Sequence, residues 1–120
     1  MARTRHYRDL LVWQKAMDLV RFVYRETEAF PQSEVFGLRL QIRRAAVSVP
    51  SNIAEGHGRL TDPQLRNALG IARGSLYELQ TQITLAGDLK MVSLEAASQI
   101  LETSTEVAKL INGLIHVLEP

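Results

Sequence analysis

The chain has 120 residues, no cysteine and a formal net charge of +1 at pH 7. This length suits a single domain with one modest hydrophobic core, and the lack of cysteine excludes disulfide bonds and thiolate metal sites. No run of about eighteen apolar residues occurs, so no membrane-spanning helix is expected. The N-terminus is basic but lacks the apolar stretch of a signal peptide, which predicts a cytoplasmic location.

The charge is unevenly distributed along the chain. Residues 1–60 carry ten Lys and Arg against six Asp and Glu, a balance of +4, whereas residues 61–120 carry four against seven, a balance of −3. This asymmetry is compatible with a basic face that contacts nucleic acid or an acidic partner. It is equally compatible with charge pairing between helices, which is the favoured interpretation.

Four helical segments are predicted, and the first runs from about residue 9 to residue 28, with Asp9 as its N-cap. Its apolar residues recur at spacings of three and four, as on one face of a helix. They form the stripe Leu10, Trp13, Met17, Val20 and Tyr24. A second stripe beside it comprises Val12, Ala16, Leu19 and Val23. Phe30 and Pro31 break the pattern.

Ser33 is the predicted N-cap of the second helix, and Gly56 to Gly58 is its predicted end, where a glycine is expected in the left-handed conformation. Pro50 lies inside the apolar pattern and predicts a kink or a brief interruption, because proline removes a backbone donor and clashes with the preceding turn. Ser48, Ser51 and Asn52 are the expected partners of the freed backbone groups. The core stripe comprises Leu38, Ile42, Ala45, Val49 and Ile53.

The third and fourth helices have clear start signals. Thr61 and Gln64 form a capping box, and a proline follows in the first turn; Gly87 is the predicted end of this helix. Ser93 is the predicted N-cap of the last helix, which also has two apolar stripes. One comprises Leu94, Ala97, Leu101, Ala108, Ile111, Ile115 and Leu118, with Ser104 in the middle position, and the other Ile100, Val107, Leu110, Leu114 and Val117.

These segments predict an all-α fold, since no stretch alternates polar and apolar residues at strand period. Short connections predict an antiparallel up-down-up-down four-helix bundle over residues 9–120, preceded by a basic arm of residues 1–8. A bundle core requires one apolar stripe per helix, yet the first and last helices have two. The extra stripe either widens the core contact or meets a neighbouring subunit, and the second alternative predicts an oligomer.

The sequence offers little support for catalysis or for a metal site. The three histidines, His6, His57 and His116, share no motif, and no Glu-x-x-His pair is present. Ser75 lacks the frame of a nucleophile elbow, and no glycine-rich phosphate loop occurs. A protein without enzymatic activity, cofactor or metal is therefore predicted.

Polar side chains near a predicted packed face require partners. Asn52 and Glu55 flank the core residue Ile53, and each would cost on the order of 1–3 kcal/mol if buried without a hydrogen bond. A guanidinium from the second or third helix is the expected partner, in a network that fixes helix register; a surface that binds phosphates is the alternative. The predicted structural network comprises Arg43, Asn52, Glu55, Arg73 and Glu78.

The remaining arginines are expected to face solvent and are the candidates for contact with nucleic acid. They are Arg39, Arg44, Arg59 and Arg66, together with Arg3, Arg5 and Arg8 of the N-terminal arm. A solvated tail is the commoner interpretation of such an arm, and an arm that orders on nucleic acid or a partner is the alternative.

Two glycines inside the third helix also require an explanation. Gly70 and Gly74 lie one turn apart, and each costs about 1 kcal/mol relative to alanine. Close packing against another helix, within the subunit or across a subunit boundary, is the expected compensation. Approach of a ligand to the backbone is the weaker alternative.

A series of motifs in fixed order spans nearly the whole chain. They are Tyr7-x-Asp9-Leu-x-Val12-Trp13, Phe30-Pro31, Phe36-Gly37-Leu38, Gln41-Ile-Arg-Arg-Ala, Val49-Pro50-Ser-Asn-Ile-Ala-Glu-Gly56, Ile71-Ala-Arg-Gly-Ser75-x-x-Glu78-x-x-x-Gln82 and Asn112-Gly-Leu-Ile115. In these residues the chain resembles the bacterial four-helix-bundle proteins first noticed as products of intervening sequences within large-subunit ribosomal RNA genes. A related branch is the accessory variability protein of diversity-generating retroelements.

The resemblance implies a fold, an assembly and an activity. The fold is an up-down four-helix bundle, and the assembly is a five-membered ring with a central channel. The activity is binding to RNA or DNA and, in the retroelement branch, to a reverse transcriptase through basic surface residues. The leading hypothesis is therefore a non-catalytic oligomeric binding module for nucleic acid or a nucleic-acid-handling protein. The alternative is a structural protein–protein adaptor that binds no nucleic acid.

Overall fold

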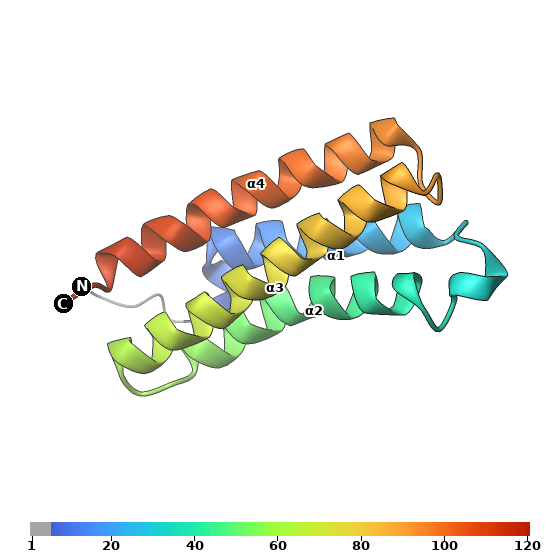
Figure 1. Cartoon of the computed structure of the whole chain (residues 1–120). Coiled ribbons are helices and arrows are strands. Elements are labelled where there is room, and N and C mark those ends of the chain that lie inside the picture. The colour runs from blue at the N-terminus through green and yellow to red at the C-terminus, as the bar shows by residue number, and fades with distance from the viewer. Residues whose placement is uncertain (1–5) are drawn as a thin grey trace.

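The computed structural model describes residues 6–120, so the predicted contacts of Arg3 and Arg5 lie outside the described residues. Its helices are α1 (Leu11–Thr27), α2 (Leu38–His57), α3 (Asp62–Asp88) and α4 (Leu94–Val117), with two short 3-10 helices, η1 (Tyr7–Asp9) and η2 (Gln32–Glu34). Consecutive helices pack against each other, and α1 also packs against α4, which closes a bundle measuring 46 × 23 × 22 Å. The helices run up and down in turn (Figure 1), which confirms the predicted all-α fold.

Two of the four predicted helix starts are confirmed. At α3 the Thr61 hydroxyl accepts a hydrogen bond from the backbone N–H of Gln64 at 3.3 Å. At α4 the Ser93 hydroxyl accepts from the backbone N–H of Ala96 at 3.0 Å. Each bond satisfies one of the amide donors that the first turn of a helix leaves unpaired.

The other two predicted caps are wrong. Asp9 belongs to η1, which His6 caps, and α1 begins after Leu10 without any side-chain cap. Ser33 belongs to η2, and α2 begins only at Leu38. There the Glu34 carboxylate accepts from the backbone N–H of Leu38 at 3.0 Å, so it satisfies one of the donors that the first turn of α2 leaves unpaired.

The glycines at the predicted helix ends have a different role from the one expected. No glycine in residues 6–120 has a positive φ. Gly56 lies where α2 meets α3, and a Cβ atom at this position would lie 2.5 Å from the Cβ of Ala68. Helix α3 continues past Gly87 and is closed by Lys90, which has a φ of 62°, while the N–H of Met91 donates to the carbonyl of Ala86. This is the pattern of a Schellman motif without glycine.

Helix α2 continues through Pro50 without the predicted interruption. The Ser51 hydroxyl donates to the carbonyl of Val47 at 2.8 Å, and the Asn52 amide donates to the carbonyl of Ser48 at 2.8 Å. These side chains supply donors in the turn that the proline weakens, and the ring of Pro50 is itself buried.

The two apolar stripes of α1 divide between core and surface. The core receives Val12, Ala16, Leu19 and Val23, whereas Trp13, Met17 and Val20 are only partly buried. Helix α4 differs, because Ile100 and Val107 from one stripe and Ile111 from the other are all fully buried. The extra stripe of α4 thus widens the core contact at Ile100 and Val107, whereas the rest of it, like that of α1, remains partly exposed.

None of the helices in residues 6–120 has an apolar stretch that would cross a bilayer.

Candidate binding surfaces

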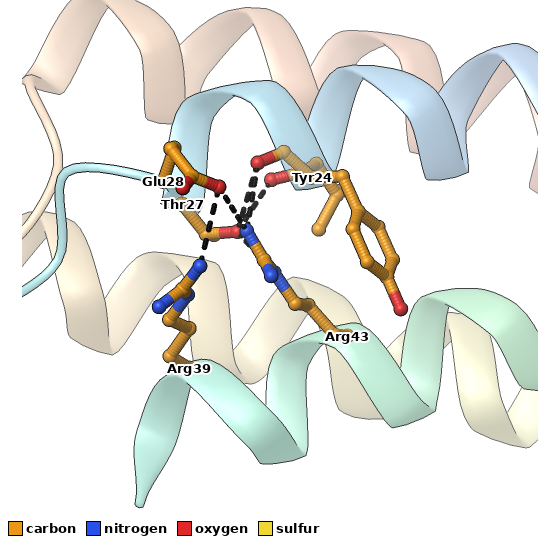
Figure 2. Close-up of polar contacts among 6 residues, drawn as sticks. Tyr24, Thr27, Glu28, Arg39 and Arg43 are labelled. Atoms are coloured by element: carbon orange, nitrogen blue, oxygen red, sulfur yellow. Dashed lines mark hydrogen bonds and ion pairs between the residues drawn. The ribbon is translucent and has the colours of Figure 1, made fainter. Parts of the chain in front are cut away.

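Two arginines of α2 hold the end of α1 in a contact that we call the arginine clasp, which comprises Tyr24, Thr27, Glu28, Arg39 and Arg43 (Figure 2). One carboxylate oxygen of Glu28 accepts from an Nη of each guanidinium at 3.2 Å. Arg43 also donates from Nε to the Thr27 hydroxyl at 2.9 Å and from Nη to the Tyr24 carbonyl at 3.0 Å. Its guanidinium lies 4.3 Å from the centre of the Tyr24 ring, a cation–π distance.

The clasp corrects the prediction that Arg39 faces solvent. The side chains of Arg39 and Arg43 are 16% and 17% exposed, and the Nε of Arg39 is buried without a hydrogen-bond partner among the described residues. Glu28 is 76% exposed, and its carboxylate pairs with both guanidinium groups. Arg39 is therefore part of the packing of α2 against the end of α1.

The other residues predicted to share a network with Arg43 lie in four separate contacts. Asn52 bonds to Ser48, whose hydroxyl lies 2.8 Å from that of Ser75 across the α2–α3 boundary. The remaining pairs are Glu55 with Arg59 at 2.7 Å, Arg73 with Asn112 at 3.0 Å, and Glu78 with Gln82 at 3.2 Å. The structure thus shows separate contacts in place of one predicted network.

The candidate nucleic-acid contacts that are described divide by position. The start of α1, the end of α4 and the α2–α3 connection lie at one end of the bundle (Figure 1), so Arg8, Arg59 and Arg66 share that end. Arg39, in the first turn of α2, lies at the opposite end, and Arg44 lies one turn further along α2. Arg8 and Arg44 are exposed and form no ion pair with any residue in 6–120.

At the end that Arg8 shares with Arg59 and Arg66, carboxylates balance the positive charge of the latter two. Arg59 pairs with Glu55 at 2.7 Å, and Arg66 lies 3.8 Å from Glu119, beyond hydrogen-bond distance. Asp9 and Asp62 lie at the same end. Within the described residues the charges at this end are therefore nearly balanced, and a strong positive patch is absent.

Two polar hollows flank the first turns of α3. The first, which we call the amide hollow, lies between α2 and α3 and has a volume of about 410 Å³. It is lined by Asn52, Glu55, Arg59, Pro63, Gln64, Asn67, Ala68 and Ile71. The second, of about 290 Å³, faces α4 and is lined by Arg66, Asn67, Gly70, Ile71, Arg73 and Ile115. The two hollows share Asn67 and Ile71, so they form one continuous surface.

Two apolar grooves flank α1. The groove between α1 and α2 has a volume of about 360 Å³ and is lined by Tyr7, Trp13, Met17, Val20, Val47, Pro50, Ser51 and Ala54. The groove between α1 and α4 measures about 270 Å³ and is lined by Leu10, Leu11, Val12, Leu110, Gly113, Leu114 and Val117. Both contain the partly exposed apolar side chains that the doubled stripes of the sequence had indicated.

The glycines inside α3 do not pack closely within the subunit. A Cβ atom at Gly70 or Gly74 would meet no atom within 4 Å, and the same holds for Gly113 of α4. The predicted compensation for Gly70 and Gly74 by close packing inside the bundle is therefore wrong. Approach by a neighbouring subunit or by a ligand stays a prediction.

The fold and these open surfaces define a small helical-bundle protein, and no group of three metal-binding side chains occurs in residues 6–120. The chain belongs to the 23S rRNA-intervening sequence protein family, whose match covers residues 8–113. It is also similar to a crystal structure from Bacteroides thetaiotaomicron, described as a protein of unknown function from the S23 ribosomal protein family. The identity is 25% and the TM-score is 0.80, over 88% of this chain and 96% of the other. No curated protein has significant similarity to the chain.

Proposed function

We propose that the chain is a non-catalytic module that assembles with copies of itself and binds nucleic acid. The observation that carries the first part is the pair of apolar grooves on the two sides of α1. Trp13, Met17 and Val20 belong to the stripe of α1 that is only partly buried, and their partial exposure in water is unfavourable. Contact with another subunit would cover them.

The arrangement of the grooves favours a ring over a symmetric pair. In a cyclic assembly with more than two members, each subunit uses two different surfaces, one for each neighbour. The groove beside α2 and the groove beside α4 are lined by different residues, so they supply two such surfaces. The five-membered ring implied by the resemblance is consistent with this arrangement, and the subunit number is part of the proposal.

Sedimentation velocity of Val47→Glu tests the assembly. Val47 is 40% exposed on the wall of the α1–α2 groove, so the substitution places a charge in the proposed contact without opening the core. We expect the variant to sediment as a single copy at concentrations where the unmodified protein is oligomeric. Gln99→Glu adds the same charge on the exposed face of α4 and is expected to remain oligomeric. An unmodified protein that stays a single copy at high concentration would contradict the proposal.

Nucleic-acid binding is supported by the family, which is named for intervening sequences of 23S ribosomal RNA, and by the exposed arginines. Arg8 and Arg44 have no acidic partner in residues 6–120, and Arg66 is only loosely paired. A single copy therefore offers few positive charges. An assembly repeats each of them in every subunit, which strengthens the attraction to a phosphate backbone.

A filter-binding titration against structured RNA and duplex DNA at increasing salt tests this part of the proposal. We expect affinity to fall as salt rises, because phosphate contacts release counterions. Arg66→Gln is expected to weaken binding to every sequence and to lower the slope of the salt dependence. Lys109→Gln removes a positive charge from the exposed face of α4 and is expected to change binding less. Affinity that does not depend on salt would exclude phosphate contacts.

A protein–protein adaptor is the second candidate, favoured by the pairing of Arg39 and Arg59 with carboxylates and by the apolar grooves. The two candidates differ after nuclease treatment. An adaptor keeps a bound polypeptide when nucleic acid is digested, whereas a nucleic-acid binder releases what it had retained. Native mass spectrometry of the treated and untreated protein measures this difference directly, together with the number of subunits.

A further inference from the structure

The amide hollow has a chemistry that differs from that of a phosphate site. It contains the side-chain amides of Asn52, Gln64 and Asn67 and the carboxylate of Glu55, with one guanidinium, that of Arg59. Glu55 and Arg59 pair at 2.7 Å, so the hollow contains no excess positive charge from this pair. A phosphate would meet the Glu55 carboxylate there, which is unfavourable. A neutral ligand with several hydrogen-bonding groups would not meet this penalty.

The amides of the hollow retain hydrogen-bonding capacity. Asn52 donates to the carbonyl and hydroxyl of Ser48, which leaves its Oδ1 without a partner among the described residues. Gln64 accepts a hydrogen bond from the Thr61 hydroxyl through its Oε1, and its amide N–H donors have no partner among the described residues. Asn67 is exposed and forms no side-chain hydrogen bond with the described residues. The hollow therefore presents both donors and acceptors to a ligand.

The walls of the hollow are suited to a flat molecule with apolar faces. Pro63, Ala68 and Ile71 contribute apolar surface between the polar groups, and Ile71 is 51% exposed. The volume of about 410 Å³ lies in the range of small-ligand sites. A nucleobase combines apolar faces with donors and acceptors on its edge, and asparagine, glutamine and glutamate are side chains that read such edges.

The second hollow is suited to the strand that carries such a base. It shares Asn67 and Ile71 with the amide hollow and adds Arg66 and Arg73. It also contains Gly70, where no side chain covers the backbone of α3. A sugar–phosphate backbone in this position would approach the helix closely and lie beside two guanidinium groups, which accounts for a glycine that the packing of the subunit does not explain.

We infer that the amide hollow binds one unpaired base of a nucleic-acid strand, whose backbone lies in the adjoining hollow beside Arg66 and Arg73. The inference rests on the nucleic-acid binding proposed above and adds that the ligand contains single-stranded segments. The base has to be unpaired because its edge and faces are accessible together only outside a duplex. The Glu55 carboxylate can accept from an exocyclic amino group, and an asparagine or glutamine amide matches the donor and acceptor on the edge of adenine, so adenine is preferred to uracil. The hollows adjoin α3, diagonally across the bundle from α1, so binding is compatible with the proposed assembly.

Fluorescence anisotropy with labelled oligo(A), oligo(U) and the duplex of the two tests the inference. We expect the unmodified protein to bind oligo(A) more tightly than oligo(U) or the duplex. Asn67→Leu fills the hollow and removes an amide from an exposed helical position, and it is expected to weaken oligo(A) binding about tenfold. Duplex binding and its salt dependence should not change. Asn67→Ala is a second variant without added bulk, and Gln99→Leu, on the exposed face of α4, is the matched control.

The possible results separate this inference from the function on which it rests. If Asn67→Leu and Asn67→Ala leave oligo(A) binding unchanged, or weaken duplex binding equally, the hollow does not hold a base. Nucleic-acid binding itself then stands, because the duplex is still bound and Arg66→Gln still weakens it. If the unmodified protein binds none of the three probes at low salt, the proposed function fails and the inference fails with it. If both variants bind oligo(A) more weakly and bind the duplex as tightly as before, the result supports a base in the hollow.

Discussion

The two sides of α2 show opposite ways of packing helices. On the α3 side, Gly56 lies against Ala68, and the hydroxyls of Ser48 and Ser75 lie 2.8 Å apart, so small side chains let the helices approach closely. On the α1 side, larger residues such as Trp13 leave an apolar groove of about 360 Å³. The arginine clasp joins α1 and α2 beyond this groove, at the end of α1.

The difference shows at which helix contact one subunit buries its own apolar surface. Where small residues face each other, as Gly56 and Ala68 do, the helices approach closely and bury apolar surface within the subunit. A boundary formed by large side chains that meet only partly leaves apolar surface in water. The close α2–α3 contact therefore accounts for stability within the subunit, and the apolar surface beside α1 is where a neighbouring subunit is expected.

The largest expected effect breaks the close boundary. Gly56→Val places a branched side chain where even a Cβ lies 2.5 Å from the Cβ of Ala68 and 3.1 Å from Leu65. The Cβ of Ala68 is attached directly to the backbone of α3, so the two helices would have to separate, and we expect a loss of about 3 kcal/mol in the free energy of unfolding. Denaturant unfolding at equal protein concentrations measures it. Equal stability of the variant and the unmodified protein would show that α2 and α3 do not approach this closely.

An intermediate effect on stability is expected when the arginine clasp loses Arg43. Arg43→Met keeps the aliphatic part of the side chain and removes the hydrogen bonds to Thr27, Glu28 and the Tyr24 carbonyl. We expect unfolding to become easier by about 2 kcal/mol, because the buried Thr27 hydroxyl loses a partner. The adjacent Arg44→Met is the matched control, since Arg44 is exposed, and it should change stability by about 0.5 kcal/mol or less. Equal effects of both substitutions would argue against the clasp.

The smallest expected effect has the opposite sign and concerns the outer face of α3. Gly74→Ala adds a methyl group where no atom lies within 4 Å, so it should stabilise the isolated helix bundle by about 0.5–1 kcal/mol. Thermal unfolding monitored by circular dichroism measures this gain. A loss of stability that grows with protein concentration would instead show that a second subunit covers Gly74.

Much of the fold followed from short-range patterns. Thr61 and Ser93 act as caps in the structure as predicted, because a cap depends only on the three or so residues that follow it. The number of helices and their antiparallel order followed from periodicity and short connections. The cap at Ser33 failed because a carboxylate one residue later, that of Glu34, serves a helix that begins at Leu38.

The site was less accessible to sequence reasoning. The arginines could be recognised as cations, but a pattern on one helix does not show which carboxylate faces it. Arg39 therefore appeared among the candidates for ligand contact, although Glu28, eleven residues away along the chain, holds it. Thr27 was missed in the same way, since only the packing of α1 on α2 brings it within 2.9 Å of Arg43.

The sequence by itself determined the helical class, the order of the helices and two of their caps, because each depends on residues within one or two turns. Tertiary structure alone decided which stripe of α1 enters the core, which arginines are bound inside the protein, and why Gly56 is a glycine. These features depend on side chains from different helices competing for the same space and the same partners. Such competition is resolved only when the helices pack.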